Sequence, residues 1–378
     1  MLNDIKNKNQ NLLIIFSILI VGLFLRLWIS QFGYNHDFVM WKINLDLFTN
    51  GESFYAYEKY NYSPFWIYIL YILDSITFNI ENTETFYRYK IIIFLSIVDF
   101  FIFLLLKQNY SLKIGLLFFF NPISIFITGY HNQFDNIAIL LGFISVLLYQ
   151  KNNSEKKIFL PLILLGLSLC MKHILFFFPI WLFFKEKKIN KKITILLIPY
   201  SIFFLSFVPY YIDVNHIIDN VFLYKSLSNG PFWTMFAPEI FHIYFDKKTM
   251  FSIFIIFLGI LVKKRDWLNS YLLYLISIVT FSSAIANQYF AIPLLALAIF
   301  WNWKYIVYTT LCCLVFLIDG DALNIKYLVQ TFNWNLRYTW ISYYPIILFL
   351  FIGLIENYLG KKKYNFTIKK ALSLIKKY

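Results

Sequence analysis

Charged side chains are scarce in this sequence, and several motifs of common enzyme chemistries are missing. Only 14% of the 378 residues are charged, whereas 60% are hydrophobic. There is no GxGxxG, no P-loop and no HExxH, so nucleotide-driven transfer and zinc-protease chemistry have no support. The three cysteines, Cys170, Cys312 and Cys313, lie in apolar runs without a CxxC pair, so neither a zinc site nor a disulfide framework is indicated.

Apolar residues come instead in repeated runs of about 17–22, the length needed to cross the hydrocarbon core of a bilayer. A soluble enzyme of this size lacks such a pattern, and we predict an all-α, polytopic membrane protein. The net charge of +14 comes from lysine clusters between the runs, as expected for cytoplasmic loops, so no nucleic-acid partner is needed to explain it. No linker, low-complexity tract or internal repeat is evident, and residues 1–378 are assigned to one membrane domain.

The lysine clusters also predict the topology. The first apolar run, residues 12–30, follows Lys6 and Lys8 without a cleavage site, so we interpret it as a retained signal-anchor helix with a cytoplasmic N-terminus. Both termini are expected in the cytoplasm, because an even number of runs separates the start of the chain from its basic tail. Five basic segments are placed on the cytoplasmic side: 107–113, 151–157, 185–192, 263–265 and 361–377.

About twelve membrane spans follow from this pattern. The expected spans are 12–31, 88–106, 114–129, 135–150, 158–172, 174–185, 193–210, 248–262, 267–285, 288–303, 305–318 and 340–357. One further apolar run, 63–80, would invert every later loop if it crossed, so we place it as an interfacial helix in a long first extracytoplasmic loop. The large outer segments are then 32–87, 211–247 and 319–339.

Two polar motifs lie at the expected outer ends of apolar helices. The first outer loop opens with FGYNHDFVMW, where the Asp37 carboxylate either serves as a general base or is an ordinary solvated loop residue. The span at 114–129 ends in GYHNQFDN, a density of polar groups that is costly at a membrane boundary unless it lines a polar cavity.

Cations on the outer side oppose the positive-inside trend and indicate an anion. In CMKHILFFFPIW, Lys172 and His173 interrupt apolar sequence at the outer face; they either bind a phosphate or snorkel to anionic headgroups. Asp99 lies in the middle of an apolar span and is expected to pair with another helix or to be protonated. Gln288, in ANQYFAIP, either binds a hydroxyl-rich ligand or caps a helix.

The order of these motifs resembles the GT-C superfamily of membrane glycosyltransferases, particularly the glucosyltransferases of dolichol-linked oligosaccharide synthesis and the first mannosyltransferase of GPI-anchor synthesis. The resemblance covers residues 12–185 as a core module, followed by variable helices at 186–357 and a basic tail at 358–378. The matching elements, in order, are His36-Asp37, NYSPFW with Tyr62 and Pro64, Arg88 with Asp99, FNP with GYHNQFDN, and MKH before Pro179.

The resemblance implies an inverting hexosyltransferase that uses a polyprenyl-phosphate sugar donor and a lipid-linked glycan or protein acceptor. Asp37 would be the catalytic base. The donor phosphate would be bound by Arg88, Lys172, His173, Lys225 and Arg337. Sugar or acceptor hydroxyls would be bound by His36, Tyr62, His131, Asn132, Gln133, Asp135 and Gln288. The acidic motif is HD rather than DxD, which favours a mechanism without a metal or other cofactor.

Two other functions fit parts of the pattern. A transporter or flippase for a lipid-linked glycan would place polar residues near the membrane midplane, often on broken helices in both halves, whereas these clusters lie at the outer boundary. A surface-polysaccharide polymerase or ligase would centre on a large outer loop rich in Arg and His, and the segment 211–247 is only modestly rich in these residues.

We expect the protein in a bacterial plasma membrane rather than in the endoplasmic reticulum. Membrane lipid surrounds the helices, and the active site is expected on the extracytoplasmic side.

Overall fold

The computed structural model describes residues 2–57, 60–76, 83–151, 158–224, 230–236, 246–319, 322–332 and 339–359. The described residues form helices of several kinds and contain no strand. The prediction of an all-helical protein is therefore confirmed for this part of the chain.

The first half of the chain builds a row of helices interrupted by short turns. The elements are α1 (Leu2–Ser30), α2 (His36–Thr49), η1 (Phe54–Ala56), α3 (Phe65–Ser75), α4 (Thr83–Asn109), α5 (Leu112–Phe119), α6 (Pro122–Phe126), the π-helical turn η2 (Ile127–His131), α7 (Asp135–Lys151), α8 (Phe159–Met171), η4 (His173–Leu175) and α9 (Phe178–Phe183).

The second half of the chain also consists of helices joined by short segments. Its elements are α10 (Ile189–Leu205), η5 (Val208–Asp213), α11 (Val214–Ile217), η6 (Ile218–Phe222), α12 (Pro231–Phe236), α14 (Lys247–Leu261), α15 (Trp267–Thr280), η7 (Asn287–Ala291), α16 (Leu294–Ile299), α17 (Trp303–Ile318), α18 (Lys326–Phe332) and α19 (Thr339–Leu359).

Two single helices are long and apolar enough to cross a membrane, 12–30 within α1 and 84–109 within α4. Up to five spans result if each of three bent helix pairs counts as one. The expected span at 114–129 is one of these pairs: α5 ends before Asn121, and Pro122 then opens α6 after a bend of 45°, because proline suits the first turn of a helix but not its interior. A membrane protein fits these helices, and the number of about twelve spans stays a prediction.

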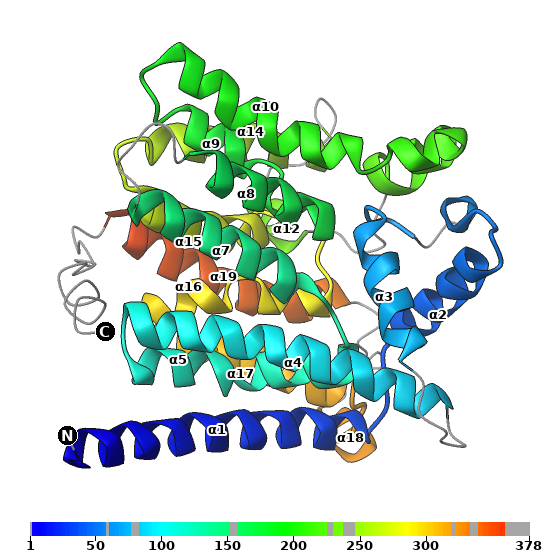
Figure 1. Ribbon diagram of the computed structural model, residues 1–378, viewed down its shortest axis with the longest axis vertical. Coiled ribbons are helices and arrows are strands. Elements are labelled where there is room, and N and C mark those ends of the chain that lie inside the picture. The colour runs from blue at the N-terminus through cyan, green and yellow to red at the C-terminus, as the bar shows by residue number, and fades with distance from the viewer. Residues whose placement is uncertain are drawn as a thin grey trace.

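The long helices lie side by side in the bundle, and α2 and α3 lie at one end of it (Figure 1). α1 forms one edge, where Leu13, Phe16 and Phe24 are each more than half exposed. Apolar exposure of this extent on a 29-residue helix is what contact with lipid tails requires. The central helix α7 packs against α8, α15 and α4.

Two of the basic segments that were predicted to share one side of the membrane, 185–192 and 263–265, meet at one end of the bundle. The Lys185 ammonium donates hydrogen bonds to the carbonyl oxygens of Val262 (2.8 Å) and Arg265 (2.7 Å), and the Arg265 guanidinium donates to the Tyr358 carbonyl. Gln150, near the end of α7, donates to Asp266. Because α7 has 17 residues, it is about 25 Å long, so Asp135 at its start lies far from these lysines.

A buried ion pair ties the first helix to the rest of the bundle. The Arg26 guanidinium on α1 lies 3.0 Å from the Asp99 carboxylate on α4, and it also donates to the carbonyl of Phe119 and the hydroxyl of Ser124. Thr128 and Asn136 donate to the same carboxylate. Asp99 therefore has the helix partner that the sequence predicted, and five segments are joined at one carboxylate.

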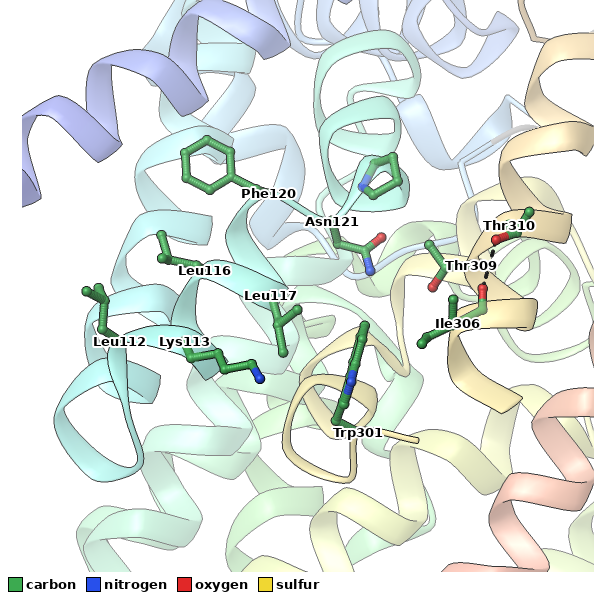
Figure 2. A pocket seen from close by; sticks show the side chains of 11 residues that line it. Leu112, Lys113, Leu116, Leu117, Phe120, Asn121, Trp301, Ile306, Thr309 and Thr310 are labelled. Carbon is green, nitrogen blue, oxygen red and sulfur yellow. Dashed lines mark hydrogen bonds between the residues drawn. The ribbon is translucent and has the colours of Figure 1, made fainter. Parts of the chain in front are cut away.

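An open groove of about 520 Å³ lies between α5 and α17 (Figure 2). Leu112, Leu116 and Leu117 line it from α5, and Trp301 and Ile306 line it from the other side. Its few polar groups include Lys113 and Asn121. The groove shares no lining residue with the motifs GYNHDF, GYHNQFDN and MKH.

Candidate functional site

Asp37 lies in the first turn of α2, and a neighbouring asparagine fixes its position. The Asn35 side chain caps α2 by accepting a hydrogen bond from the Asp37 backbone N–H at 3.0 Å, the usual role of asparagine at this position. The same side chain forms a hydrogen bond of 2.6 Å with Nδ1 of His131, as the amide donor. Because His131 is fully buried, it anchors the start of α2 and thereby the carboxylate.

Gln133 connects the carboxylate to a cation. Its amide N–H donates to Oδ2 of Asp37, and its carbonyl oxygen accepts a hydrogen bond of 3.3 Å from the Lys172 ammonium. Lys172 in turn lies 2.6 Å from the Asp135 carboxylate. Four residues that the sequence selected from three separate segments therefore form one connected cluster, which we call the carboxylate–lysine cluster: Asp37, Gln133, Asp135 and Lys172.

The segment that carries Gln133 and Asp135 has an unusual backbone. A π-helical turn, a feature often found at functional sites, ends at Asn132, whose φ of 60° is left-handed. Asparagine tolerates this conformation better than most residues. Gly129 lets this turn approach α1 closely, because a Cβ there would lie 2.5 Å from the Arg26 carbonyl oxygen.

Arg88 holds the same segment in place. Its guanidinium donates to the Asn132 side chain at 2.9 Å and to the carbonyl oxygens of Ser30, Gly33, Gly129 and Tyr130. The sequence assigned Arg88 to a donor phosphate, but its hydrogen-bonding groups are already directed at protein oxygens. Asn132, assigned to a sugar hydroxyl, is likewise bonded to Arg88 and to two backbone carbonyls.

The surroundings of Asp37 change its acidity. Burial raises the pKa of the Asp37 carboxyl above its ordinary value, and the nearby Lys172 ammonium and the Gln133 hydrogen bond lower it in part. A carboxylate with a raised pKa is a stronger base than a solvated one, and catalytic bases are often tuned in this direction. Asp37 is half-buried rather than sealed, so a ligand can reach it.

Aromatic rings surround the cation. The Lys172 ammonium lies 5.5 Å from the ring centre of Tyr62 and 5.1 Å from that of Phe134, within the range of favourable cation–π contact. Phe134 stacks on Trp66 of α3 with ring centres 4.0 Å apart. The Ser63 hydroxyl donates to the Cys170 carbonyl at the end of α8. The segment from Tyr62 to Trp66 is thus packed directly beside Lys172.

Lys172 and His173 line a cavity of about 350 Å³. Most of its wall is apolar, with Phe176, Phe177, Phe203 and Phe251 among the lining side chains. Its other polar lining residues are Tyr224, Lys248, Ser252, Ser282, Ser283 and Tyr289. The cavity therefore combines two lysines with a long hydrophobic wall, which suits a ligand with an anionic group and an apolar chain.

The remaining predicted residues lie in different places. His36 is exposed next to Asp37, and Tyr62 is buried beneath Lys172. Gln288 is half-buried and does not line the cavity, whereas its neighbour Tyr289 does. Lys225 and Arg337 lie outside the described residues. Within the described part of the chain, no three His, Cys, Asp or Glu side chains are gathered closely enough to hold a metal ion.

Several residues of the site were missed at the sequence level. Asn35 directly precedes His36-Asp37, and its preference for a helix N-cap was the available signal. Tyr224, Lys248 and the serines at 282–283 come from segments without a distinctive motif, so only their packing around the cavity marks them.

Comparisons of the chain with protein-family models, curated protein sequences and solved structures find no match. The likeness to the GT-C superfamily therefore remains a prediction from the order of motifs, and a function is inferred from the cluster and the cavity.

Proposed function

We propose that this chain is a membrane glycosyltransferase that moves a hexose from a polyprenyl-phosphate donor to an acceptor hydroxyl at the end of the bundle that carries Asp37. One observation supports this most strongly. A half-buried carboxylate with a raised pKa is joined through Gln133 to a lysine that lines a cavity with a mainly apolar wall. A base, a cation and a place for a lipid chain are the components that such a transfer requires.

The proposed reaction is a single displacement. Asp37 accepts the proton of the acceptor hydroxyl as its oxygen attacks the anomeric carbon. The bond between that carbon and the phosphate oxygen breaks on the opposite face, so the configuration inverts and polyprenyl phosphate leaves. The carboxylate–lysine cluster holds the base and the cation in a fixed relation, which makes productive attack more frequent.

Lys172 is the proposed ligand of the departing phosphate. Two of its N–H groups are used by Asp135 and Gln133, and the described residues provide no acceptor for the third. A preorganised cation in a site poor in water stabilises developing negative charge strongly. Lys248, which donates to the Tyr224 carbonyl, lines the same cavity and is the second proposed cation for the departing phosphate. His173 lines this cavity as well. In this proposal Arg88 positions the segment that carries Gln133 and does not contact the phosphate.

The direct test is incubation of the purified protein with polyprenyl-phosphate hexoses carrying a labelled sugar, together with lipid-linked glycan and peptide acceptors. We expect label in an acceptor and release of one polyprenyl phosphate for each hexose transferred. Movement of intact donor between the leaflets of a proteoliposome, without release of polyprenyl phosphate, would indicate the flippase instead. If no hexose is transferred with any donor and acceptor of the panel, the proposal is contradicted.

The proposed site should face away from the cytoplasm, and two exposed positions at opposite ends of the bundle test this. His36→Cys, beside Asp37, is expected to react with a membrane-impermeant maleimide in intact cells. Lys264→Cys, next to Arg265 at the other end, is expected to react only after the membrane is opened. Both side chains are exposed, whereas Cys170 and Cys312 are buried, and the half-buried Cys313 is replaced by serine in both variants. Labelling with the two positions reversed would place Asp37 in the cytoplasm and contradict the topology.

A further inference from the structure

A second, much smaller cavity lies behind the carboxylate–lysine cluster. Its volume is about 20 Å³, and its polar lining residues are Asp99, Ser124, Thr128, Gln133, Asp135 and Asn136. It thus lies between the buried Arg26–Asp99 pair and the Lys172–Asp135 pair. A space of this size holds one water molecule.

Two buried oxygen atoms at this cavity lack a hydrogen-bond donor. The Asn136 amide N–H groups donate to the carbonyl of Leu95 (3.0 Å) and to Oδ1 of Asp99 (2.9 Å), which fixes the orientation of the amide. Its own Oδ1 is buried without a donor among the described residues. Asp135 accepts the Lys172 hydrogen bond with Oδ2. Its Oδ1 is likewise buried without a donor among the described residues.

Such oxygen atoms are costly unless something donates to them. A buried acceptor without a donor loses its hydration without replacement, and the loss is larger for a carboxylate. The nearby hydroxyls cannot help, because Thr128 and Ser124 already donate to Oδ2 of Asp99. A water molecule has two O–H donors, which matches the two acceptors.

We infer that one water molecule occupies this cavity and donates to Oδ1 of Asp135 and Oδ1 of Asn136. The water completes a chain of polar contacts from Asp37 through Gln133, Lys172 and Asp135 to Asn136, Asp99 and Arg26. Asp99 and Asp135 then each have a cation and a hydrogen bond to both carboxylate oxygen atoms, as buried charges require.

The water has a consequence for the site, which rests on the proposed function. Asp135 orients the Lys172 ammonium, and the water holds the second oxygen of Asp135. Asn136 is therefore a positioning residue, because it acts on Lys172 through the water and Asp135. Loss of the water is expected to raise the KM for the lipid donor several-fold while the acceptor KM stays unchanged.

A high-resolution structure of the full chain in a lipid nanodisc tests the water site directly. We expect one isolated density between Asp135 and Asn136, at about 2.7–3.0 Å from both oxygen atoms. An empty cavity would overturn the inference. So would a density with several oxygen neighbours at clearly shorter distances, since that is a bound cation.

A pair of matched variants tests the same site by stability. Ala291 lines the cavity, so Ala291→Val is expected to displace the water and leave both oxygen atoms without a donor. Ala286, half-buried like Ala291 and directly before the same helix η7, does not line the cavity, and Ala286→Val controls for the added methyl groups. We expect Ala291→Val to have a Tm lower than that of Ala286→Val by at least about 2 °C. If the cavity is dry, Ala291→Val fills a void and its Tm equals or exceeds the control, which would overturn the inference.

The density and the Tm difference do not depend on catalysis. If both are observed while no hexose is transferred, the water site stands and the proposed function fails. If transfer is observed with an empty cavity, the function stands and the water is refuted.

Discussion

Asp37→Asn is expected to lower the turnover of hexose transfer by about 10²–10⁴-fold, the range that a positioned general base contributes. Asparagine has the same shape and can still accept the Gln133 hydrogen bond, but it cannot take a proton from the acceptor hydroxyl. Folding and expression should be preserved, because the N-cap contact of Asn35 is with the backbone N–H of residue 37 and not with its side chain. The measurement is kcat with a labelled donor, together with Tm.

Asp46 provides the matched control for this variant. It lies on the same helix, α2, and its side chain is exposed. Asp46→Asn makes the same chemical change at a position away from the cluster and is expected to leave kcat within about twofold of the wild type, as for a surface substitution. A fully active Asp37→Asn protein would remove Asp37 from the role of base.

Lys172→Met is expected to lower kcat by about 10²–10³-fold, the cost of losing one preorganised group that stabilises developing negative charge. Methionine keeps much of the length of the side chain against the rings of Tyr62 and Phe134 but has no charge for the leaving phosphate. The apparent affinity for the polyprenyl-phosphate donor should fall as well. An unchanged donor KM and kcat would exclude Lys172 as a phosphate ligand.

The same variant changes the pH dependence in a direction that follows from Asp37. A base works only when ionised, so wild-type activity should fall as the pH is lowered through the raised pKa of Asp37. Among the groups that lower this pKa, Lys172 contributes most. Its removal raises the pKa further, and the acid limb of the residual activity in Lys172→Met should move to higher pH.

Three further variants, at Lys172, Gln133 and Lys264, separate the effect of the Lys172 charge from that of the structure around it. Lys172→Arg keeps a cation and should recover part of both the rate and the wild-type acid limb. Gln133→Leu removes the hydrogen bond that lowers the same pKa and also the acceptor of one Lys172 N–H, but it leaves the Lys172 charge in place, so its acid limb should move in the same direction by a smaller amount. Lys264→Met removes an exposed cation at the other end of the bundle. It should change neither the rate nor the acid limb of the activity.

The polar residues of the cluster could be selected from the sequence because polar groups interrupting apolar runs are costly and therefore rare. Asp37, Gln133 and Lys172 each lie where an apolar run ends, and that position alone placed them at one side. Arg88 and Asn132 gave the same signal for a different reason. They form hydrogen bonds with backbone carbonyls and with each other. A polar residue at a helix end looks the same in sequence whether it binds a ligand or another part of the chain.

Hydropathy alone determined that this protein is all-helical and suited to a membrane, because the transfer free energy of an apolar run depends only on its own residues. The tertiary structure decided which charges meet, as in the pairing of Arg26 with Asp99 and of Lys172 with Asp135. It also built one cavity from α10, α14 and α15 beside residues of the first half. Such contacts depend on how helices distant in the chain pack together, and no local pattern of residues encodes the distance between two side chains on different helices.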